Sequence, residues 1–261
     1  MKDYSNIFVE VPDNGISRIK LNDPKNYNAL SLKTITSLIE IFQVFSNNNN
    51  TKVIVIEGLG KGFSAGHNLK EINELKGKPD YKKLFSLCSE LMITIMKNNK
   101  PVIAKVHGAA FAAGCQLVAT CDLALSSKDA IFATPGVNIG LFCSTPMVAV
   151  SRNVARKQVM KMLLTGEPIK ASFAKEIGLI NDYFNESELE KEILKLSKTI
   201  CKKSSKILKV GKEAFYNQLE MPLSDAYKYT SEVMTKNMMT LDAKEGISAF
   251  LKKRTPTWKN K

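Results

Sequence analysis

The sequence has few of the residues on which metal and disulfide sites depend. Only two histidines, His67 and His107, occur among 261 residues, and none of the five cysteines forms a CxxC pair. Histidine and cysteine are the main zinc ligands of proteins, so the sequence argues against a metal site. Scattered cysteines in apolar surroundings instead predict reduced, buried thiols.

Long apolar stretches are also missing. No window offers the roughly 18 or more consecutive apolar residues that a membrane-spanning helix needs. Residues 1–6 show neither a charged segment followed by an apolar one nor the arginine- and serine-rich composition of a transit peptide. We therefore expect no membrane partner and a cytoplasmic location.

Acidic residues are too few to balance the basic ones. Lysine and arginine number 38 and aspartate and glutamate 25, which gives a formal net charge of +13. A polyanion such as nucleic acid would account for this excess. The lysines are spread along the chain without interleaved aromatic residues, which is more typical of a solvated surface. Nucleic acid is therefore the partner with the least support.

Two loops rich in small residues each follow an apolar run. Residues 62–70 (GFSAGHNLK) follow the run at 53–56, and residues 108–116 (GAAFAAGCQ) follow the run at 102–106. Small residues let a backbone turn tightly and approach a ligand closely. Two such loops after two buried strands predict paired backbone N–H groups aimed at one anion.

The remaining pattern predicts an α/β fold. Alternating runs before and after Asp13-Asn14-Gly15 indicate a β-hairpin, and Ser31 precedes apolar residues at helical spacing. Successive strand–strand–helix units predict stacked parallel turns with helices outside. We expect strands at residues 52–58, 102–106, 121–125, 130–133 and 179–180, and helices at 70–97 with a break near 77–79, at 114–120, and through most of the chain from 156.

Apolar stripes recur in the C-terminal third. They run from Leu189 to Ile200, from Ile207 to Leu219 and from Val233 to Leu241, each along one helix face. Leucine and methionine stripes of this kind are typical of a core or a subunit interface and much less of a cofactor site. They predict a helical cap or oligomerisation layer.

Several motifs, in this order, resemble those of the crotonase (enoyl-CoA hydratase/isomerase) superfamily over nearly the whole chain. Each motif alone is loose, but their order and spacing are specific. Residues 132–146 are most similar to the enoyl-CoA hydratase domain-containing subgroup. The motifs are NALS at 28–31, FSAGHNLK at 63–70, KPVIA to CDLA at 100–124, TGEPI to GLI at 165–180 and GISAFLKKR at 246–254.

The resemblance implies a crotonase (ClpP-like) spiral of strand–strand–helix turns with the acyl-CoA site at residues 1–200. It further implies a C-terminal helical trimerisation region at residues 201–261, assembled as a homotrimer or a dimer of trimers. The implied ligand is an acyl-CoA thioester. Coenzyme A would be part of the substrate, with no separate cofactor and no metal.

The resemblance assigns two oxyanion-binding N–H groups to His67 and Ala113. Chemistry beside a thioester carbonyl places negative charge on its oxygen, and one pre-organised donor lowers the barrier by typically about 2.7–4 kcal/mol. Gly114 would open a helix whose N-terminus adds positive potential. Ala112 and Ala113 replace two glycines of the family motif, so we expect Ala113 to keep a negative φ.

The resemblance also maps contacts to coenzyme A. Lys25 and Lys253 could equally be ordinary surface lysines. The mapped residues are Lys25, Asn26 and Tyr27 at the pantetheine and phosphate end, Ala65, Asn68, Leu69 and Lys70 at the adenine side, and Lys253 toward a neighbouring subunit's coenzyme A phosphates.

The catalytic positions depart from the family pattern. Hydratases carry glutamates where this chain has Gln116 and Gly136, and some relatives carry a carboxylate where it has Ser144. None of these three side chains can act as a carboxylate acid or base. Acid–base catalysis typically contributes about 10²–10⁴-fold, so we expect ordinary hydration to be crippled. Gln116 could still position water or substrate.

Three hypotheses remain open. The first is an enzyme that stabilises a thioester enolate or oxyanion, with decarboxylation or thioester hydrolysis as compatible reactions. The second is a non-catalytic acyl-CoA binding or scaffold protein, and the third is a nucleic-acid binder. Asn138, Cys143 and Ser144 are the polar side chains expected near the acyl group. We expect Cys143 to be structural rather than nucleophilic, because nothing nearby in sequence lowers its pKa, and His107 to be structural as well.

Overall fold

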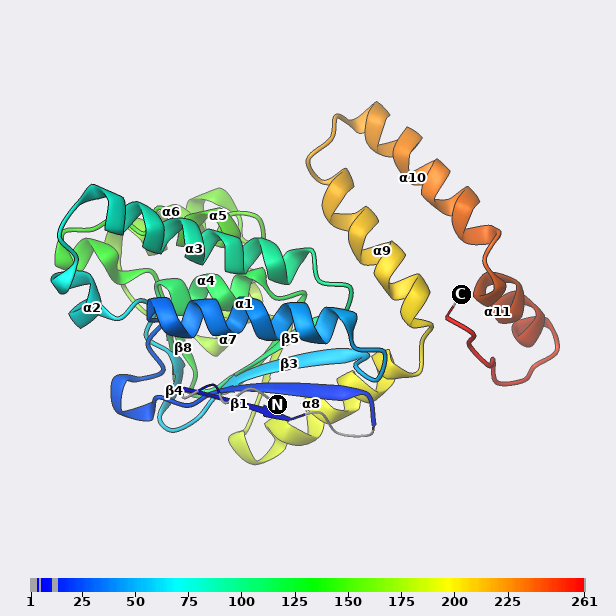
Figure 1. Cartoon of the computed structure of the whole chain (residues 1–261), viewed down its shortest axis with the longest axis horizontal. Coiled ribbons are helices and arrows are strands. Elements are labelled where there is room, and N and C mark those ends of the chain that lie inside the picture. Colours follow the sequence, from blue (N-terminus) through cyan, green and yellow to red (C-terminus); the bar gives the residue numbers. More distant parts are fainter. Residues whose placement is uncertain (1–3, 5, 11–13, 261) are drawn as a thin grey trace.

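Two sheets form the body of the molecule, and a helical arm extends from it (Figure 1). The computed structural model describes residues 4, 6–10 and 14–260. Within them the larger sheet has the strand order β1-β2-β3-β5-β7-β10, and the smaller one has β4-β6-β8-β9. The strands are β1 (Ile7–Glu10), β2 (Ile16–Leu21), β3 (Val53–Gly58), β4 (Gly62–Ser64), β5 (Val102–Val106), β6 (Ala109–Phe111), β7 (Leu123–Ser127), β8 (Ile131–Ala133), β9 (Ile169–Lys170) and β10 (Asp182–Phe184).

The body is built from repeated strand–strand–helix turns. Strands β3, β5 and β7 open successive turns and pair in parallel in the larger sheet. Strands β4, β6 and β8 follow them and pair in parallel in the smaller sheet. The predicted α/β fold of stacked parallel turns is confirmed. The body helices are η1 (Pro24–Asn26), α1 (Leu32–Asn47), α2 (Leu69–Glu74), α3 (Lys78–Met96), α4 (Ala113–Thr120), η2 (Pro135–Ile139), α5 (Pro146–Val150), α6 (Arg156–Thr165), α7 (Ala171–Glu176) and α8 (Glu186–Cys201).

Several local signals act as the sequence predicts. The Ser31 hydroxyl accepts the Thr34 amide at 3.1 Å and caps α1. Pro79 lies in the first turn of α3, where a missing N–H leaves no bond unmade. Strands β1 and β2 form the predicted antiparallel hairpin, although residues 11–13 of its turn lie outside the described residues.

Three predicted elements are corrected. The strand predicted at residues 179–180 is wrong, because both amides bond to the Ala174 carbonyl where Gly178 turns with φ +84° after α7. The last strand is β10 instead. The strand predicted at 121–125 begins at Leu123, since the Cys121 amide still bonds to carbonyls of α4. The stripe from Val233 to Leu241 belongs to two helices, because Thr240 caps a new one.

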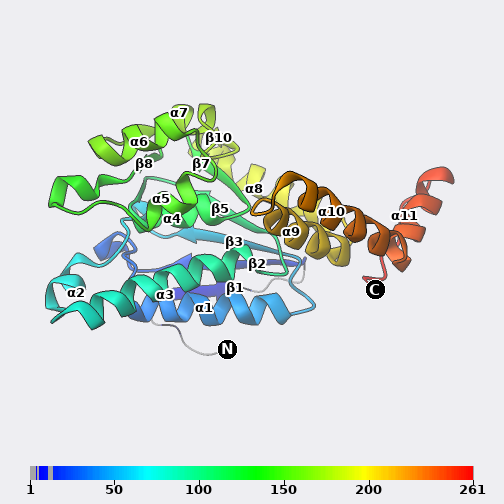
Figure 2. The same cartoon turned by 90° about the horizontal axis from the view of Figure 1, so that it is seen from above.

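The larger sheet is covered on both faces (Figure 2). Its side toward α1 and α3 carries the main apolar core, which includes Ile19, Ile54 and Ala104. Its other side packs against α8 through a smaller cluster that includes Val55, Ile103 and Ile193. Strand residues alternate between the faces, so β2, β3, β5 and β7 each contribute buried residues to both clusters.

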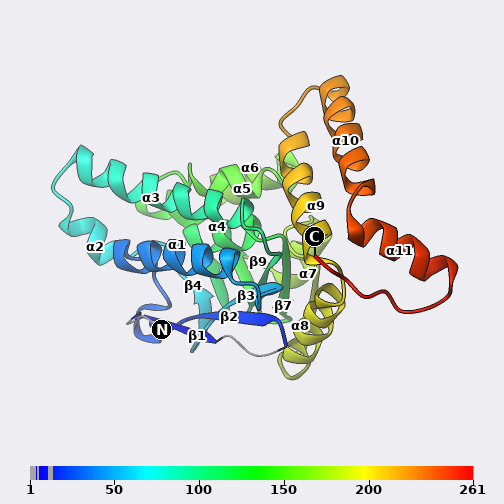
Figure 3. The same cartoon turned by 45° about the vertical axis from the view of Figure 1, so that its right-hand side comes forward.

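The arm consists of α9 (Ser205–Gln218), α10 (Leu223–Met238) and α11 (Leu241–Leu251), and it projects away from the sheets (Figure 3). It begins after α8, whose last residue lies beside the predicted boundary between residues 200 and 201. Many of its large apolar side chains are exposed, among them Leu223, Phe250 and Leu251 at 74–83%. The arm therefore presents an apolar surface that the body does not cover.

Candidate active site

The two loops that the sequence singles out lie against each other. Gly66 has φ +90°, and a Cβ atom on it would lie 3.0 Å from the Ala113 nitrogen and 2.9 Å from the Phe111 oxygen. Any side chain at Gly66 would therefore push the second loop away. This close approach brings the backbone on either side of His67 next to the start of α4.

The amides of His67 and Ala113 donate no hydrogen bond to any described residue. Ala113 is the first residue of α4, whose opening amides have no partner inside the helix. The residues around them are bonded, since the Leu30 amide donates to the Gly66 oxygen at 2.7 Å and the Ala112 amide to the Ala133 oxygen at 2.9 Å. Two unpaired N–H groups thus come from adjacent strand-to-helix loops.

Both residues line one cavity of about 510 Å³, which we call the thioester cavity after the ligand that the resemblance implies. Its wall is mainly apolar, and no aspartate, glutamate, lysine or arginine belongs to it among the described residues. It brings together six predicted site residues besides His67 and Ala113, counting Asn138 and Cys143, which were predicted only as polar neighbours of the acyl group. The lining is Ala65, His67, Leu69, Ile72, Phe85, Ala112, Ala113, Pro135, Gly136, Asn138, Ile139, Leu141, Phe142, Cys143, Ser144, Thr145 and Pro146.

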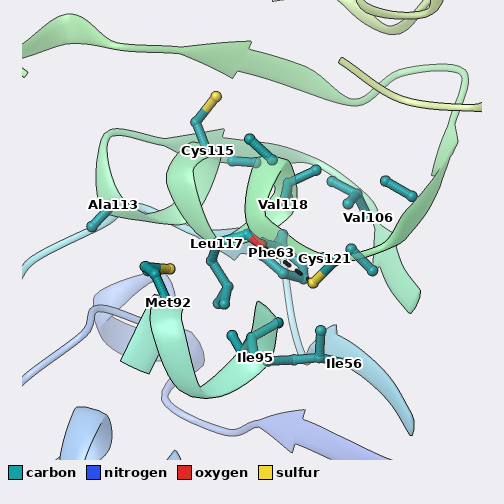
Figure 4. Close-up of a cluster of buried hydrophobic side chains, with 14 of the residues drawn as sticks. Ile56, Phe63, Met92, Ile95, Val106, Ala113, Cys115, Leu117, Val118 and Cys121 are labelled. Carbon is teal, nitrogen blue, oxygen red and sulfur yellow. Dashed lines mark hydrogen bonds between the residues drawn. The ribbon is translucent and has the colours of Figure 1, made fainter. Parts of the chain in front are cut away.

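Helix α4 is fixed from behind by the apolar core. Leu117 and Val118 are buried and lie among side chains of α3 and the strands (Figure 4). At its start, a Cβ atom on Gly114 would lie 2.2 Å from the Ser64 oxygen, so only glycine fits there. Helix α4 begins at Ala113, one residue before the predicted start at Gly114, and the first loop sets its position.

Backbone strain in the second loop falls on Ala112. This residue has φ +47° and ψ −116°, whereas Ala113 is helical and keeps the negative φ that we predicted. A non-glycine residue in a sparsely populated region typically costs about 1–3 kcal/mol. No pattern in the sequence indicated that Ala112, the residue before Ala113, would carry this cost.

The loop around Gly136 leaves no space for a larger side chain at that position. A Cβ atom at Gly136 would lie 2.7 Å from the Leu141 oxygen and 2.9 Å from the Cys143 sulfur. The Leu141 amide donates to the Gly136 oxygen at 2.9 Å and holds the loop in this shape. Hydratases of the family carry a glutamate at this position. This chain has glycine there, and the surrounding backbone leaves no room for a glutamate side chain.

The His67 side chain lies in the wall with both ring nitrogens buried and unpaired among the described residues. Burial lowers the pKa of the imidazole. Phe85 packs edge-on against the ring at 5.6 Å between centroids. The imidazole is therefore neutral near pH 7 and adds little charge to the cavity.

The side chains of Cys143 and Ser144 form hydrogen bonds within their own loop. The Gly136 amide donates to the Cys143 sulfur at 3.3 Å, and burial raises the pKa of the thiol. The Ser144 hydroxyl donates to the Phe142 oxygen at 3.3 Å. A protonated thiol is a weak nucleophile, so the geometry favours the structural interpretation of Cys143.

Gln116 lies outside the lining of the thioester cavity. It is buried and lines a neighbouring cavity of about 270 Å³ with Met92, Met96 and Val148. The Cys88 thiol approaches its side-chain oxygen at 3.9 Å. The structure therefore separates Gln116 from the other four residues that we predicted at the catalytic positions.

The residues mapped to coenzyme A form two groups. The Tyr27 oxygen accepts the Ala65 amide at 2.9 Å, which joins the turn of Lys25 and Asn26 to the first loop. Asn68 caps α2, where its side chain accepts the Lys70 amide at 3.1 Å, and Leu69 is exposed at the cavity. Lys253, by contrast, follows α11 at the far end of the arm (Figure 3).

Sequence reasoning missed the side chain that ties these parts together. Asn28 is buried, and its amide group bonds to the Asp23 amide and to the Leu59 and Gly62 oxygens, each at 2.8 Å. It has φ +53°. An asparagine among small residues before a helix cap was the available signal. For the cavity residues Phe85 and Thr145 the sequence offered no such signal, because each resembles an ordinary helix or helix-cap residue among its neighbours.

The other histidine has a structural partner, as predicted. His107 Nε2 lies 2.8 Å from the Gly60 oxygen and bridges the ends of two turns. Within the described residues, no cluster of histidine, cysteine, aspartate or glutamate could hold a metal ion. Nor does any helix among them have the length and apolar content to cross a bilayer.

A family model described as enoyl-CoA hydratase/isomerase matches residues 12–261. The chain belongs to the enoyl-CoA hydratase/isomerase family. A crystal structure of a Mycobacterium smegmatis enoyl-CoA hydratase superposes with a TM-score of 0.95 at 43% identity and covers 97% of this chain and 98% of that one. The predicted crotonase spiral is confirmed.

Relatives within the family support the subgroup that we expected. Enoyl-CoA hydratase domain-containing protein 3, mitochondrial, from Xenopus laevis is 46% identical over 246 residues, which are 94% of this chain and 84% of the relative. The crystal structure of the human enoyl-CoA hydratase domain-containing protein 3 has a TM-score of 0.94 at 45% identity and covers 97% of this chain and all of that one.

The predicted cytoplasmic location is wrong. Relatives from zebrafish (Danio rerio), Xenopus laevis and Homo sapiens at 44–46% identity are named mitochondrial proteins. That prediction rested on the composition of the first few residues, which is a weak guide to location.

Proposed function

We propose that this family member binds an acyl-CoA thioester with its carbonyl oxygen between the N–H groups of His67 and Ala113. The carrying observation is the pair of unpaired amides on adjoining loops at the wall of one apolar cavity. Two pre-organised donors favour negative charge on the thioester oxygen, as in an enolate or a tetrahedral intermediate. The N-terminus of α4 adds to the same potential.

Classical hydration is not part of the proposal. Hydration needs an acid or base beside the β-carbon, and the described lining of the thioester cavity contains no carboxylate. Reactions driven mainly by charge on the thioester oxygen, such as decarboxylation or slow thioester hydrolysis, fit the site better. The lack of a carboxylate in the described lining also favours a second candidate function, that of a non-catalytic acyl-CoA binding protein.

The oxyanion contact is tested with a ligand that lacks the carbonyl. We expect butyryl-CoA to bind more tightly than S-butyl-CoA, its thioether analogue, in titration calorimetry. Two hydrogen bonds of about 0.5–1.5 kcal/mol each correspond to a difference of roughly 5- to 150-fold. Equal affinities of the two ligands would rule out the paired donors.

Turnover separates the two candidates. A panel of acyl-CoAs is incubated with the wild type and with Gly114→Ala, which we expect to displace the first loop because of the Ser64 contact. Gly211→Ala is the matched control, since a Cβ at Gly211 meets no atom within 4 Å. Product formed by the wild type and the control but not by Gly114→Ala supports an enzyme. Binding without product supports the binding protein.

We also propose a homotrimer or a dimer of trimers, supported by the exposed apolar side chains of the arm. In such an assembly Lys253 would reach the coenzyme A phosphates of a neighbouring subunit. The names of the relatives support a mitochondrial location, which fractionation of cells expressing the tagged protein would test.

A further inference from the structure

Ser64 is a buried polar residue at the end of β4, two residues before Gly66 in the first loop. It is 1% exposed and does not belong to the described lining of the thioester cavity. Its hydroxyl donates to the Asn28 oxygen at 2.8 Å and accepts the Gly66 amide at 3.2 Å. A hydroxyl can do both at once, whereas an alanine at this position would leave both groups without this partner.

Gly66 joins the two peptide planes that decide where the His67 N–H points. The plane before Gly66 is held through its amide, which donates to the Ser64 hydroxyl. The plane after it is held through the Gly66 oxygen, which accepts the Leu30 amide at 2.7 Å. The C=O and N–H of a trans peptide point in opposite directions, so the second plane directs the His67 N–H away from Leu30.

The bond to Ser64 matters because Gly66 is the most easily rotated point of this part of the loop. Glycine has more backbone freedom than any other residue, and Gly66 has φ +90°. With both planes bonded, the two backbone angles of Gly66 are fixed, and the direction of the His67 N–H is fixed with them. Without the hydroxyl, only the bond to Leu30 holds the plane that carries this N–H, and the plane can rock about it.

The other partner of the Ser64 hydroxyl belongs to a well-anchored segment. Asn28 is 2% exposed, and its side chain bonds to three backbone groups at 2.8 Å. The neighbouring Tyr27 oxygen accepts the Ala65 amide at 2.9 Å, which attaches the same segment to the loop a second time. The hydroxyl therefore links the flexible glycine to a fixed point of the fold.

We propose that Ser64 is a positioning residue for the oxyanion contact, whose hydroxyl holds the Gly66 peptide so that the His67 N–H points at the thioester oxygen. The inference rests on the proposed function and assigns part of it to a side chain that does not touch the ligand. Loss of the hydroxyl weakens one hydrogen bond to the thioester and leaves the other contacts of the acyl-CoA as they are.

The first test measures how the full-length protein discriminates butyryl-CoA from S-butyl-CoA, which lacks the carbonyl, in titration calorimetry. We expect Ser64→Ala to bind butyryl-CoA about 2- to 12-fold more weakly than the wild type, which corresponds to one lost hydrogen bond of ordinary strength. Binding of S-butyl-CoA should stay unchanged, because that ligand makes no oxyanion contact. Ser64→Cys, whose thiol donates and accepts more weakly, should fall between Ser64→Ala and the wild type.

Infrared difference spectroscopy with butyryl-CoA isotopically labelled at the carbonyl carbon gives a readout that a general loss of stability would not change. A hydrogen bond to the thioester oxygen weakens the C=O bond and lowers its stretching frequency. We expect a lower frequency in the wild-type complex than in the free ligand, and a partial return toward the free value in Ser64→Ala.

Ser126→Ala is the matched control. Ser126 lies in β7, is 0% exposed, and its hydroxyl has no partner among the described residues, so the same substitution there should change neither readout. Should Ser64→Ala fail to fold, Ser64→Cys carries the same comparison.

The inference is overturned if Ser64→Ala keeps the discrimination and the carbonyl frequency of the wild type. It is also overturned if Ser64→Ala weakens both ligands to the same extent, which would show a purely structural role. If the wild type itself binds both ligands equally, the proposed function fails.

Discussion

Single residues in the loops have conformations that only their neighbours explain. Ala112 keeps a positive φ because its amide bonds to Ala133 while the next residue must begin α4. Gly66 and Gly114 pack so tightly on the opposite loop that a Cβ on either would collide with backbone. The site is therefore specified by a few small residues at points of close contact.

At this scale we predict that Ala112→Gly stabilises the protein. Glycine accepts φ +47° without strain, so the variant recovers part of the strain energy of about 1–3 kcal/mol. Ordering a glycine on folding costs about 0.5–1 kcal/mol more in chain entropy than ordering an alanine. Urea unfolding should show a net gain of up to about 2 kcal/mol. The control Ala113→Gly has no strain to relieve and should lose up to about 1 kcal/mol. A loss in Ala112→Gly as large as in the control would contradict the account.

We also predict that Gly136→Glu does not restore hydration. The new Cβ would collide with the Leu141 oxygen and the Cys143 sulfur, and overpacking of this kind typically costs about 1–3 kcal/mol. Gly136→Ala should lose similar stability, because the collision is with the Cβ itself. Thermal unfolding and the loss of crotonyl-CoA absorbance measure the two effects. Rapid hydration by Gly136→Glu would show that the loop opens readily.

Among the elements of the arm, α9 makes a network of buried polar contacts with the body. Lys212 donates to the Asp122 carboxylate at 2.7 Å and to the Ile95 and Lys100 oxygens at 3.0 and 3.1 Å. Tyr216, one turn on, donates to the other Asp122 oxygen at 2.9 Å. Burial lowers the pKa of Lys212, although Asp122 opposes that shift, and Lys212 is only 8% exposed.

We predict that Lys212→Met loosens this attachment. Removing one partner of a buried ion pair typically costs about 3–5 kcal/mol, and the Tyr216 hydroxyl and the Val102 amide, which still donate to Asp122, offset part of that cost. Limited proteolysis should cut near α9 much faster than in the wild type, with a matching loss in urea unfolding. Lys209→Met, an exposed change on the same helix, is the control. Equal protease resistance in both variants would show that apolar packing alone holds the arm.

At the scale of the whole molecule, the apolar surface of α10 and α11 is left uncovered by the described part of the chain, and Phe250 on it is 83% exposed. Exposed apolar area of this extent is costly in water. The proposed trimer or hexamer would remove the arm's share of that cost.

We therefore predict that Phe250→Glu shifts the assembly toward monomers. A charge at a buried contact is strongly unfavourable, whereas the body keeps its own core and should stay folded. Sedimentation velocity at micromolar concentration measures the species, and circular dichroism checks the fold. Lys252→Glu, two residues away, changes charge without removing apolar area and should leave the assembly intact. A wild type that sediments as a monomer would refute the proposed assembly.

The sequence by itself determined the local elements and the two loops. Buried runs such as residues 53–56, the Ser31 cap and the small residues at 62–70 and 108–116 act through neighbours within a few positions, so their patterns can be read directly. The order of the motifs determined the family as well. Errors arose where short apolar pairs, as at Leu179 and Ile180, serve burial without strand pairing.

Only the tertiary structure decided how the loops and side chains meet. The contact of Gly66 with Ala113, the strain at Ala112 and the closed loop at Gly136 depend on residues distant in sequence. The same holds for Gln116, which lines its own cavity with Met92 and Val148 because α3 and α5 both pack against α4. Local periodicity carries no information on such contacts, since packing between elements fixes them.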